Sequence, residues 1–439
     1  MQFDERRRFV ATLMLITLVA LTFRVIYTVT GTVRPDRYIY DSTFYRDEAR
    51  SLATGHGFVQ PGFMAPPKTH APPVASHPPL LVVLLAPVSW ASNGNELALR
   101  IFNCVMGALG VALIGLLGRE LGGARTGVVA AVLAALYPNL WVNDGLIMAE
   151  SLSVVVVAAA VLLALRVIRR PTLAGAAALG AMCGLGALTR GELVFLFPLL
   201  CLPALVVAGV RNHRRFVDLV LVASLVVVAF VGPWVAYNMR RFEKPVFIST
   251  NFDVNLLASS CPLVMHGRYI GGLWFCAGAR LRGVDESVIA ADDRKQAIAL
   301  IRDQLGHYPV VVLARIGRTW SLFRPLDGIS IGVNEGRPRW VTWLGLIGYY
   351  PLLVLAVAGA WIRRRRREVL WPMLVVPAII TAAMIASYGQ VRYRATAEPM
   401  LVVLAAHRLT AGSLRDWCPR RKSRMPARDT PVSPANGLG

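Results

Sequence analysis

Long apolar runs separated by short arginine clusters limit most strongly how this chain can fold. A helix needs roughly 20 apolar residues to cross the hydrocarbon core of a bilayer. Ten runs near that length occur in the 439 residues, at 9–29, 97–117, 126–141, 146–165, 172–188, 192–210, 216–236, 343–362, 369–388 and 397–411. The sequence therefore predicts an all-α polytopic membrane protein with about ten transmembrane helices.

The composition supports this class. The chain is 55% hydrophobic and only 16% charged, and its mean hydropathy is +0.53, which is too apolar for an ordinary soluble domain. Its net charge is +22, but no basic and aromatic recognition module accompanies that charge, so we expect no nucleic-acid partner.

The arginine clusters instead indicate the topology. If every run crosses once, one side of the membrane receives the clusters at 6–8, 119–125, 166–170, 211–215, 363–367 and from 408 onward. By the positive-inside rule this side is cytoplasmic, and both termini are expected there. The excess of arginine over lysine, with the richness in Ala, Val, Leu and Gly, indicates a bacterial source and hence the bacterial plasma (inner) membrane.

The same alternation places residues 30–96 and 237–342 outside. The first run lacks a small-residue cleavage site after it, so we expect a retained anchor. The apolar stretch 79–92 is shorter than a span and begins with prolines, which predicts a helix lying at the outer surface. Residues 1–411 are expected to form one transmembrane domain, and residues 412–439 a basic, disordered cytoplasmic tail.

The six cysteines divide by predicted compartment. Cys104, Cys183 and Cys201 lie within apolar runs, where a thiol acts as a small buried hydrophobe. Cys261 and Cys276 share the long outer segment, where oxidation is permitted, and we predict a disulfide between them.

Paired repeats with broken helices are common in transporters, and the sequence shows no such self-similarity. This favours an enzyme. The alternative is a polytopic transporter or flippase of lipid-linked or small solutes, in which the outer acids form an ion path.

Seven short motifs, in this order, resemble the GT-C glycosyltransferases, and within them the bacterial relatives of protein O-mannosyltransferases and aminoarabinose transferases. The motifs are DSTFYRDEARSLATGHGF, SHPPLL, ALRIFNCVMGALGVALIGLLGREL, ALYPNLWVNDGLIMAESL, GLGALTRGELVFLFP, GPWVAYNMRRFEKPVFISTN and VRYRATAEPMLVVLAA. The resemblance implies a GT-C-like fold with juxtamembrane helices outside the cytoplasm. It also implies inverting transfer of a hexose or pentose from a polyprenyl-phosphate donor to a hydroxyl of an envelope glycan, lipid or protein.

This chemistry needs a carboxylate that takes the proton of the acceptor and cations that meet the charge growing on the leaving phosphate. The resemblance implies that Asp41, three residues before Phe44, is the base. The adjacent acids Asp47 and Glu48 are the alternative, and the non-catalytic interpretation of Asp41 is a helix cap.

Further candidates lie in later outer turns. The resemblance places an acid such as Asp144 beside the site, and Glu150 is a candidate because an acid at a membrane helix is costly. The non-catalytic alternative for Glu150 is a structural pairing with a buried arginine. His77 is a candidate for donor binding or for a divalent metal, although a histidine before two prolines is also a common turn residue. No cofactor is expected to be required, and a divalent metal is the open alternative.

Arginine side chains suit phosphate oxygens because their donors form a fork. The candidates on the outer side rank with the pair Arg392 and Arg394 first and Arg190 next, while interaction with lipid headgroups is the alternative role for each. The remaining outer arginines with the same candidate role are Arg24, Arg100 and Arg240.

Overall fold

The computed structural model describes residues 2–31, 40–61, 72–209, 213–274 and 284–412. Within these ranges the chain is built of helices, and its only β-type pairing is an isolated bridge between Val59 and Pro73. The predicted all-α fold is confirmed. The tail from 413 onward lies outside the described ranges.

Every predicted crossing coincides with helical structure. Eight runs, including the last one, match single helices, and 126–141 matches two. Apart from the helix of the last run, these helices are α1 (Gln2–Gly31), α4 (Glu96–Gly122), α5 (Ala124–Leu136), α6 (Pro138–Trp141), α7 (Glu150–Arg169), α8 (Leu173–Thr189), α10 (His213–Met239), α16 (Arg339–Arg365) and α17 (Trp371–Ala386). The run 192–210 is irregular, with a 3₁₀ turn η1 (Gly191–Phe195), a π turn η2 (Phe197–Cys201) and α9 (Leu202–Gly209). The last run is α19 (Glu398–Thr410).

Length and composition support a multi-pass membrane protein. In the described ranges six helical stretches are long and apolar enough to cross a bilayer, and α5, α8 and α17 are apolar but shorter. Large apolar side chains lie exposed on the outer faces of α1 and α10, for example Leu15 at 62% and Val228 at 64%. Such faces suit contact with lipid rather than water. The exact number of crossings stays a prediction.

Small residues bring the membrane helices close together. A Cβ on Gly180 of α8 would lie 2.5 Å from the carbonyl oxygen of Ala223 in α10. A Cβ on Gly359 of α16 would lie 2.0 Å from the carbonyl oxygen of Leu404 in α19. Glycine is needed at both positions, because any side chain would separate the backbones that pack there.

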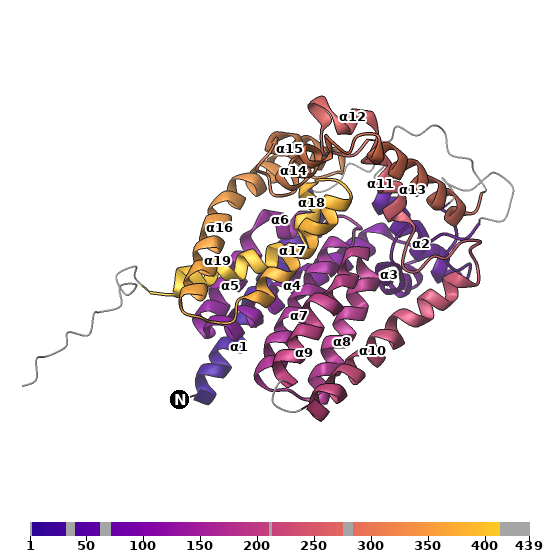
Figure 1. Ribbon diagram of the computed structural model, residues 1–439. Coiled ribbons are helices and arrows are strands. Elements are labelled where there is room, and N and C mark those ends of the chain that lie inside the picture. Colours follow the sequence, from indigo (N-terminus) through magenta and orange to yellow (C-terminus); the bar gives the residue numbers. More distant parts are fainter. Residues whose placement is uncertain (1, 32–39, 62–71, 210–212, 275–283, 413–439) are drawn as a thin grey trace, which may run out of the picture.

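The remaining helices gather at one end of the bundle, and α11 to α15 lie at the top of the view, away from the N-terminus (Figure 1). All but α18, which lies between α17 and α19, come from the two long segments that the predicted topology places outside. Their bounds are α2 (Tyr40–Ala53), α3 (Leu80–Ala91), α11 (Asn251–Ala258), α12 (Pro262–Met265), η3 (Gly267–Tyr269), α13 (Glu286–Arg302), α14 (Tyr308–Thr319), α15 (Pro325–Asn334) and α18 (Val391–Arg394).

The two outer segments contact each other directly. The guanidinium of Arg241 donates to the carbonyl oxygens of Phe58 and Val74, both at 2.7 Å. The backbone N–H of Ala75 donates to Glu286 Oε2 at 2.7 Å. These contacts join residues far apart in sequence, so the predicted outer segments 30–96 and 237–342 do lie on the same face.

The loop before α18 is held against the long outer segment. The N–H of Gly389 donates to the carbonyl oxygen of Gly271 at 2.9 Å. The buried guanidinium of Arg315 donates to the carbonyl oxygens of Ser259 and Ile385, both at 2.8 Å. The position of α18 is therefore fixed by the outer segment as well as by α17.

The predicted disulfide is described at one end only. Cys261 is disulfide-bonded. Its predicted partner, Cys276, lies outside the described residues, so the pairing stays a prediction. Cys104, Cys183 and Cys201 are buried free thiols, as expected for cysteines within apolar helices.

Candidate active site

A cavity of about 820 Å³ opens at the outer end of the bundle. Its walls come from α2, α13 and α18, the start of α7, the end of α8, and the segment 244–255. The sequence candidates that line it are Asp41, His77, Glu150, Arg190 and Arg392. Residues from five separate parts of the chain thus meet in one place.

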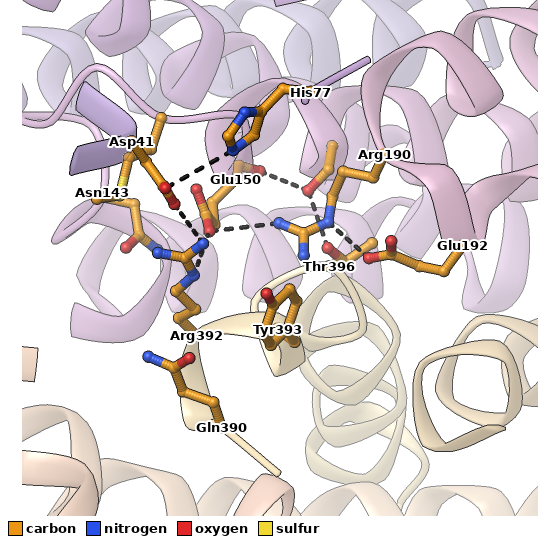
Figure 2. A network of polar contacts seen from close by, with 12 residues as sticks. Asp41, His77, Asn143, Glu150, Arg190, Glu192, Gln390, Arg392, Tyr393 and Thr396 are labelled. Carbon is orange, nitrogen blue, oxygen red and sulfur yellow. Dashed lines mark hydrogen bonds and ion pairs between the residues drawn. The ribbon is translucent and has the colours of Figure 1, made fainter. Parts of the chain in front are cut away.

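Four of these side chains, with Glu192, form a row of alternating charge, in which the side chains point toward one another (Figure 2). Arg392 Nη2 donates to Asp41 Oδ2 at 2.5 Å, and its Nε lies 3.4 Å from Glu150 Oε1. Arg190 Nη1 lies 3.3 Å from the same Glu150 oxygen, and its Nε donates to Glu192 Oε1 at 2.6 Å. The two cations therefore converge on Glu150.

Asp41 lies in the first turn of α2, where the helix dipole favours a negative charge. The next turn buries Phe44 and Tyr45, and both rings pack against the His77 imidazole, with centroid separations of 4.6 and 5.1 Å. His77 Nε2 lies 3.6 Å from Asp41 Oδ1. The stretch DSTFY, residues 41–45, thus holds the histidine through its aromatic pair and presents Asp41 to the cavity.

The ion pair sets the protonation state of Asp41. Burial raises the pKa of this carboxyl, but the Arg392 guanidinium and the nearby His77 imidazole more than offset burial and hold the pKa well below its usual range. Burial lowers the pKa of Arg392, yet Asp41 and Glu335 raise it further, and the net pKa lies well above the usual value. Asp41 is consequently a carboxylate at neutral pH.

Glu335 was not predicted from the sequence, although it holds Arg392 from the other side. Its Oε1 accepts from Arg392 Nη1 at 3.0 Å and from Gln390 Nε2 at 2.6 Å. Its other oxygen pairs with Arg337, which donates to Asn143 Oδ1 at 2.9 Å. Glu335 lies in the outer segment without any motif of its own, so only the fold brings it to the site.

The cavity wall carries two further cations and an apolar side that were not predicted from the sequence. Lys244 and Arg294 line the cavity, and Lys244 belongs to the motif GPWVAYNMRRFEKPVFISTN, which could have identified it. Phe195, Phe247 and Phe252 also line it and are half exposed or more, at 52%, 65% and 51%. Cations and exposed apolar rings thus border the same space.

At the predicted metal site, the described structure brings together two possible ligands. Asp41 and His77 bring an oxygen and a nitrogen within 3.6 Å. In the part of the chain that the structure describes, no three His, Cys, Asp or Glu side chains converge as a metal site would require. A divalent metal therefore stays a prediction.

Asp144 lies apart from the cavity in a sealed pair with Arg24 of α1. Arg24 Nε donates to Asp144 Oδ2 at 2.6 Å, and the side chains are 1% and 0% exposed. Ser151 donates to the other oxygen at 2.5 Å. A Cβ on Gly107 would lie 2.1 Å from Asp144 Oδ2, so only glycine leaves room for the carboxylate.

Arg394 also faces away from the cavity. Its Nε donates to Glu398 Oε1 at 2.7 Å, both side chains are at most 1% exposed, and its guanidinium lies 3.5 Å from the centroid of the Tyr349 ring. Of the two arginines in VRYR, only Arg392 lines the cavity.

The acidic pair of α2 lies outside the cavity lining as well. Asp47 is partly exposed and accepts from Arg46 Nε at 2.9 Å. Glu48 is fully buried, neither carboxyl oxygen has a hydrogen-bond partner among the described residues, and burial raises its pKa to about 9. Glu48 therefore carries a proton at neutral pH.

The two remaining predicted cations are also remote from the cavity lining. Arg100 pairs with Glu96 one turn earlier on α4. Arg240 is exposed just after the end of α10. Neither contacts the charge network around Asp41 in the described structure.

Part of the chain matches a known protein family. Residues 76–237 match the dolichyl-phosphate-mannose-protein mannosyltransferase family, a range that includes His77, Glu150 and Arg190 but neither Asp41 nor Arg392. No curated protein sequence matches the chain significantly.

Solved structures share the fold. The oligosaccharyltransferase AglB from Archaeoglobus fulgidus, in complex with an inhibitory peptide and a dolichol-phosphate, superposes with a TM-score of 0.55 at 16% identity, covering 92% of this chain and 50% of that one. Its apo form gives 0.54 at 17% identity, with coverages of 92% and 50%. The chain thus spans about half the length of these proteins.

ArnT from Cupriavidus metallidurans, bound to undecaprenyl phosphate, gives a TM-score of 0.42 at 17% identity, covering 91% of this chain and 76% of that one. That score is too low to support a shared fold by itself. The family match and the fold shared with AglB together confirm the resemblance to GT-C glycosyltransferases that the sequence motifs predicted.

Proposed function

We propose that this chain is a membrane glycosyltransferase that moves a sugar from a polyprenyl-phosphate carrier to an acceptor hydroxyl on the outer side of a bacterial plasma membrane. The observation that carries the proposal is the cavity, where the carboxylate of Asp41 lies beside Arg392 and Arg190 and next to exposed phenylalanines. The likeness to AglB, whose structure contains a dolichol-phosphate, supports a lipid-linked donor.

The two arginines suit the phosphate of the donor. Arg392 and Arg190 both direct a guanidinium at Glu150 Oε1, so their donors already converge within a small space. A phosphate placed there meets two forks that match its oxygens. The half-exposed Phe195, Phe247 and Phe252 give the first isoprene units an apolar surface beside it.

The reaction is a single displacement at the anomeric carbon. The acceptor oxygen forms a bond to that carbon while the bond from carbon to the phosphate oxygen breaks, and its electron pair goes to the phosphate. The acceptor proton passes to Asp41. Attack from the face opposite the phosphate inverts the anomeric configuration, and the arginines stabilise the charge that grows on the leaving group.

Donor binding also activates the base in this scheme. Without donor, Arg392 lies 2.5 Å from Asp41 and keeps its pKa low, which makes Asp41 a weak base. A phosphate that draws the guanidinium away leaves burial as the main influence, and burial raises the pKa of Asp41. Proton abstraction thus becomes efficient only when the donor is in place.

Transfer assays test the proposal. The full chain is reconstituted in liposomes with radiolabelled polyprenyl-phosphate hexoses and pentoses, and label transferred to envelope extract is measured. Asp41→Asn should lower turnover by about 100-fold or more, because an amide cannot take the proton. Asp47→Asn on the same helix, outside the cavity lining, is the control and should keep wild-type turnover.

Two outcomes would count against the proposal. Undiminished turnover of Asp41→Asn would remove this residue as the base. Absence of transfer with every donor, together with movement of solute or lipid across the proteoliposome membrane, would instead favour a transporter.

A further inference from the structure

A second cavity, of about 580 Å³, lies among the opposite ends of the membrane helices. The C-terminal ends of α4, α7, α16 and α19 line it, together with the start of α5 and the turn after α16. In Figure 1 the ends of α16 and α19 lie together beside α5, away from α11 to α15. This is the cytoplasmic end in the predicted topology, so the cavity is separate from the candidate active site.

The charge on its wall is strongly positive. Four arginines line the cavity, at 169, 363, 366 and 367, against the single acid Glu368. That acid pairs with the Arg363 guanidinium at 2.8 Å. Arg366 and Arg367 are exposed, and no described carboxylate lies within ion-pair distance of either. The wall therefore presents two cations without a counter-ion among the described residues.

A buried histidine without a partner lies in the same wall. His407 of α19 is 6% exposed, and neither ring nitrogen has a hydrogen-bond partner in the described structure. Its nearest acid is Glu368, at 4.0 Å from Nε2, which is beyond hydrogen-bonding distance. Buried polar atoms are costly when left unpaired, so this position calls for a ligand that hydrogen-bonds to it.

Two more observations fit a ligand here. Nε of the 3%-exposed Arg363 is likewise without a partner among the described atoms. Gly122 lines the cavity, and a Cβ there would lie 2.5 Å from Thr126 Oγ1 and 3.0 Å from His407 Nδ1, so glycine leaves room beside that nitrogen. Donors on α16 and α19 thus face a common space.

The rest of the wall is apolar and includes Leu121, Leu165 and Ile168. We propose that this cavity binds the phosphate headgroup of an anionic phospholipid from the inner leaflet. The guanidinium groups and His407 contact the phosphate oxygens, and the apolar side chains contact the glycerol and the first acyl carbons. Basic pockets between membrane helices at the cytoplasmic side are suited to such headgroups, whereas free phosphate makes no use of the apolar wall.

Lipid titration of the detergent-purified full chain tests the site. Phosphatidylglycerol, phosphatidylcholine and inorganic phosphate are titrated separately, and affinity is read from the thermal unfolding midpoint and from lipid retained in native mass spectrometry. We expect saturable stabilisation by phosphatidylglycerol and little effect of the other two. The double variant Arg366→Ala/Arg367→Ala should lower the affinity for phosphatidylglycerol at least about tenfold.

A matched control removes the same charge elsewhere at this end. Arg6 and Arg214 are exposed and lie outside the cavity lining, so Arg6→Ala/Arg214→Ala should change the affinity less than about twofold. Equal losses in the two double variants would reduce the effect to general surface charge and overturn the site. Binding of inorganic phosphate as tight as that of phosphatidylglycerol would overturn the lipid assignment.

Discussion

Two aspartate–arginine pairs illustrate the difference between a reactive and a structural ion pair. Asp41 and Arg392 are 18% and 15% exposed and line the outer cavity. Asp144 and Arg24 are 0% and 1% exposed and are sealed between helices. Both pairs are short and charge-assisted, so the length of the contact and the partner type do not distinguish them. Access to a cavity does, because a substrate can compete only for the pair that it reaches.

Removing the carboxylate of the sealed pair should give the largest effect. Asp144→Ala leaves the Arg24 cation buried without its acid and should lower the free energy of unfolding by about 3–5 kcal/mol. Asp41→Ala should remain folded, because Arg392 still has Glu335 and Glu150. Thermal unfolding of both purified variants measures this. Equal midpoints would abolish the distinction between the pairs.

The two arginines of VRYR sharpen the comparison from the cationic side. Arg392→Gln removes a donor that contacts the leaving phosphate in the proposed reaction and should lower kcat about 100-fold with a small change in stability. Arg394→Gln should chiefly lower the thermal midpoint, since Glu398 loses its buried partner. Turnover and unfolding are measured for both variants. A catalytic defect of equal size in folded Arg394→Gln would contradict the assignment.

The pH profile tests the coupling between Asp41 and its cation. Because the folded-state pKa of Asp41 lies below its usual value, the carboxylate is already ionised above about pH 4, and the acid limb of kcat/KM should lie below that pH. Arg392→Lys replaces the guanidinium fork with a point charge that fits the carboxylate less well, so the pKa of Asp41 should rise. The acid limb of this variant should therefore move to higher pH by a few tenths of a unit or more. An unchanged acid limb would show that the ion pair with Arg392 does not determine the pKa of Asp41.

The pKa of Glu48, on the same helix as Asp41, is shifted in the opposite direction. Its pKa is raised to about 9, so its contribution to stability is complete below the usual glutamate pKa of about 4.5 and is lost as the pH rises toward 9. Glu48→Gln cannot ionise. Its thermal midpoint should exceed that of the wild type by about 2 °C or more at pH 9 and match it near pH 5. A constant difference across this range would exclude titration of Glu48.

The sequence predicted the fold well, because the length of an apolar run is a local property that directly reflects bilayer thickness. Motifs also identified Asp41, His77, Glu150, Arg190 and Arg392, which the structure brings together. Local patterns could not predict the direction in which each side chain points.

Arg392 and Arg394 are two positions apart, and a helix turns successive side chains by about 100°. The pair therefore points to nearly opposite sides, one to the cavity and one to Glu398. Glu335 was missed for a related reason, since its contact with Arg392 depends on how the outer segment folds back over the helices. Motif order carries no information on such long-range contacts.

The hydrogen bond between Gly271 and Gly389 bears on protein engineering. Each glycine is pressed against α14, where an added Cβ would lie within 2.9 Å of its backbone, so neither position tolerates a larger residue. A chimera that imports a foreign segment for 237–342 to redirect acceptor choice would therefore need to preserve this seam. Without this hydrogen bond, the graft would displace the loop that carries Arg392. A swap intended to alter acceptor choice would then also impair recognition of the donor in the proposed reaction.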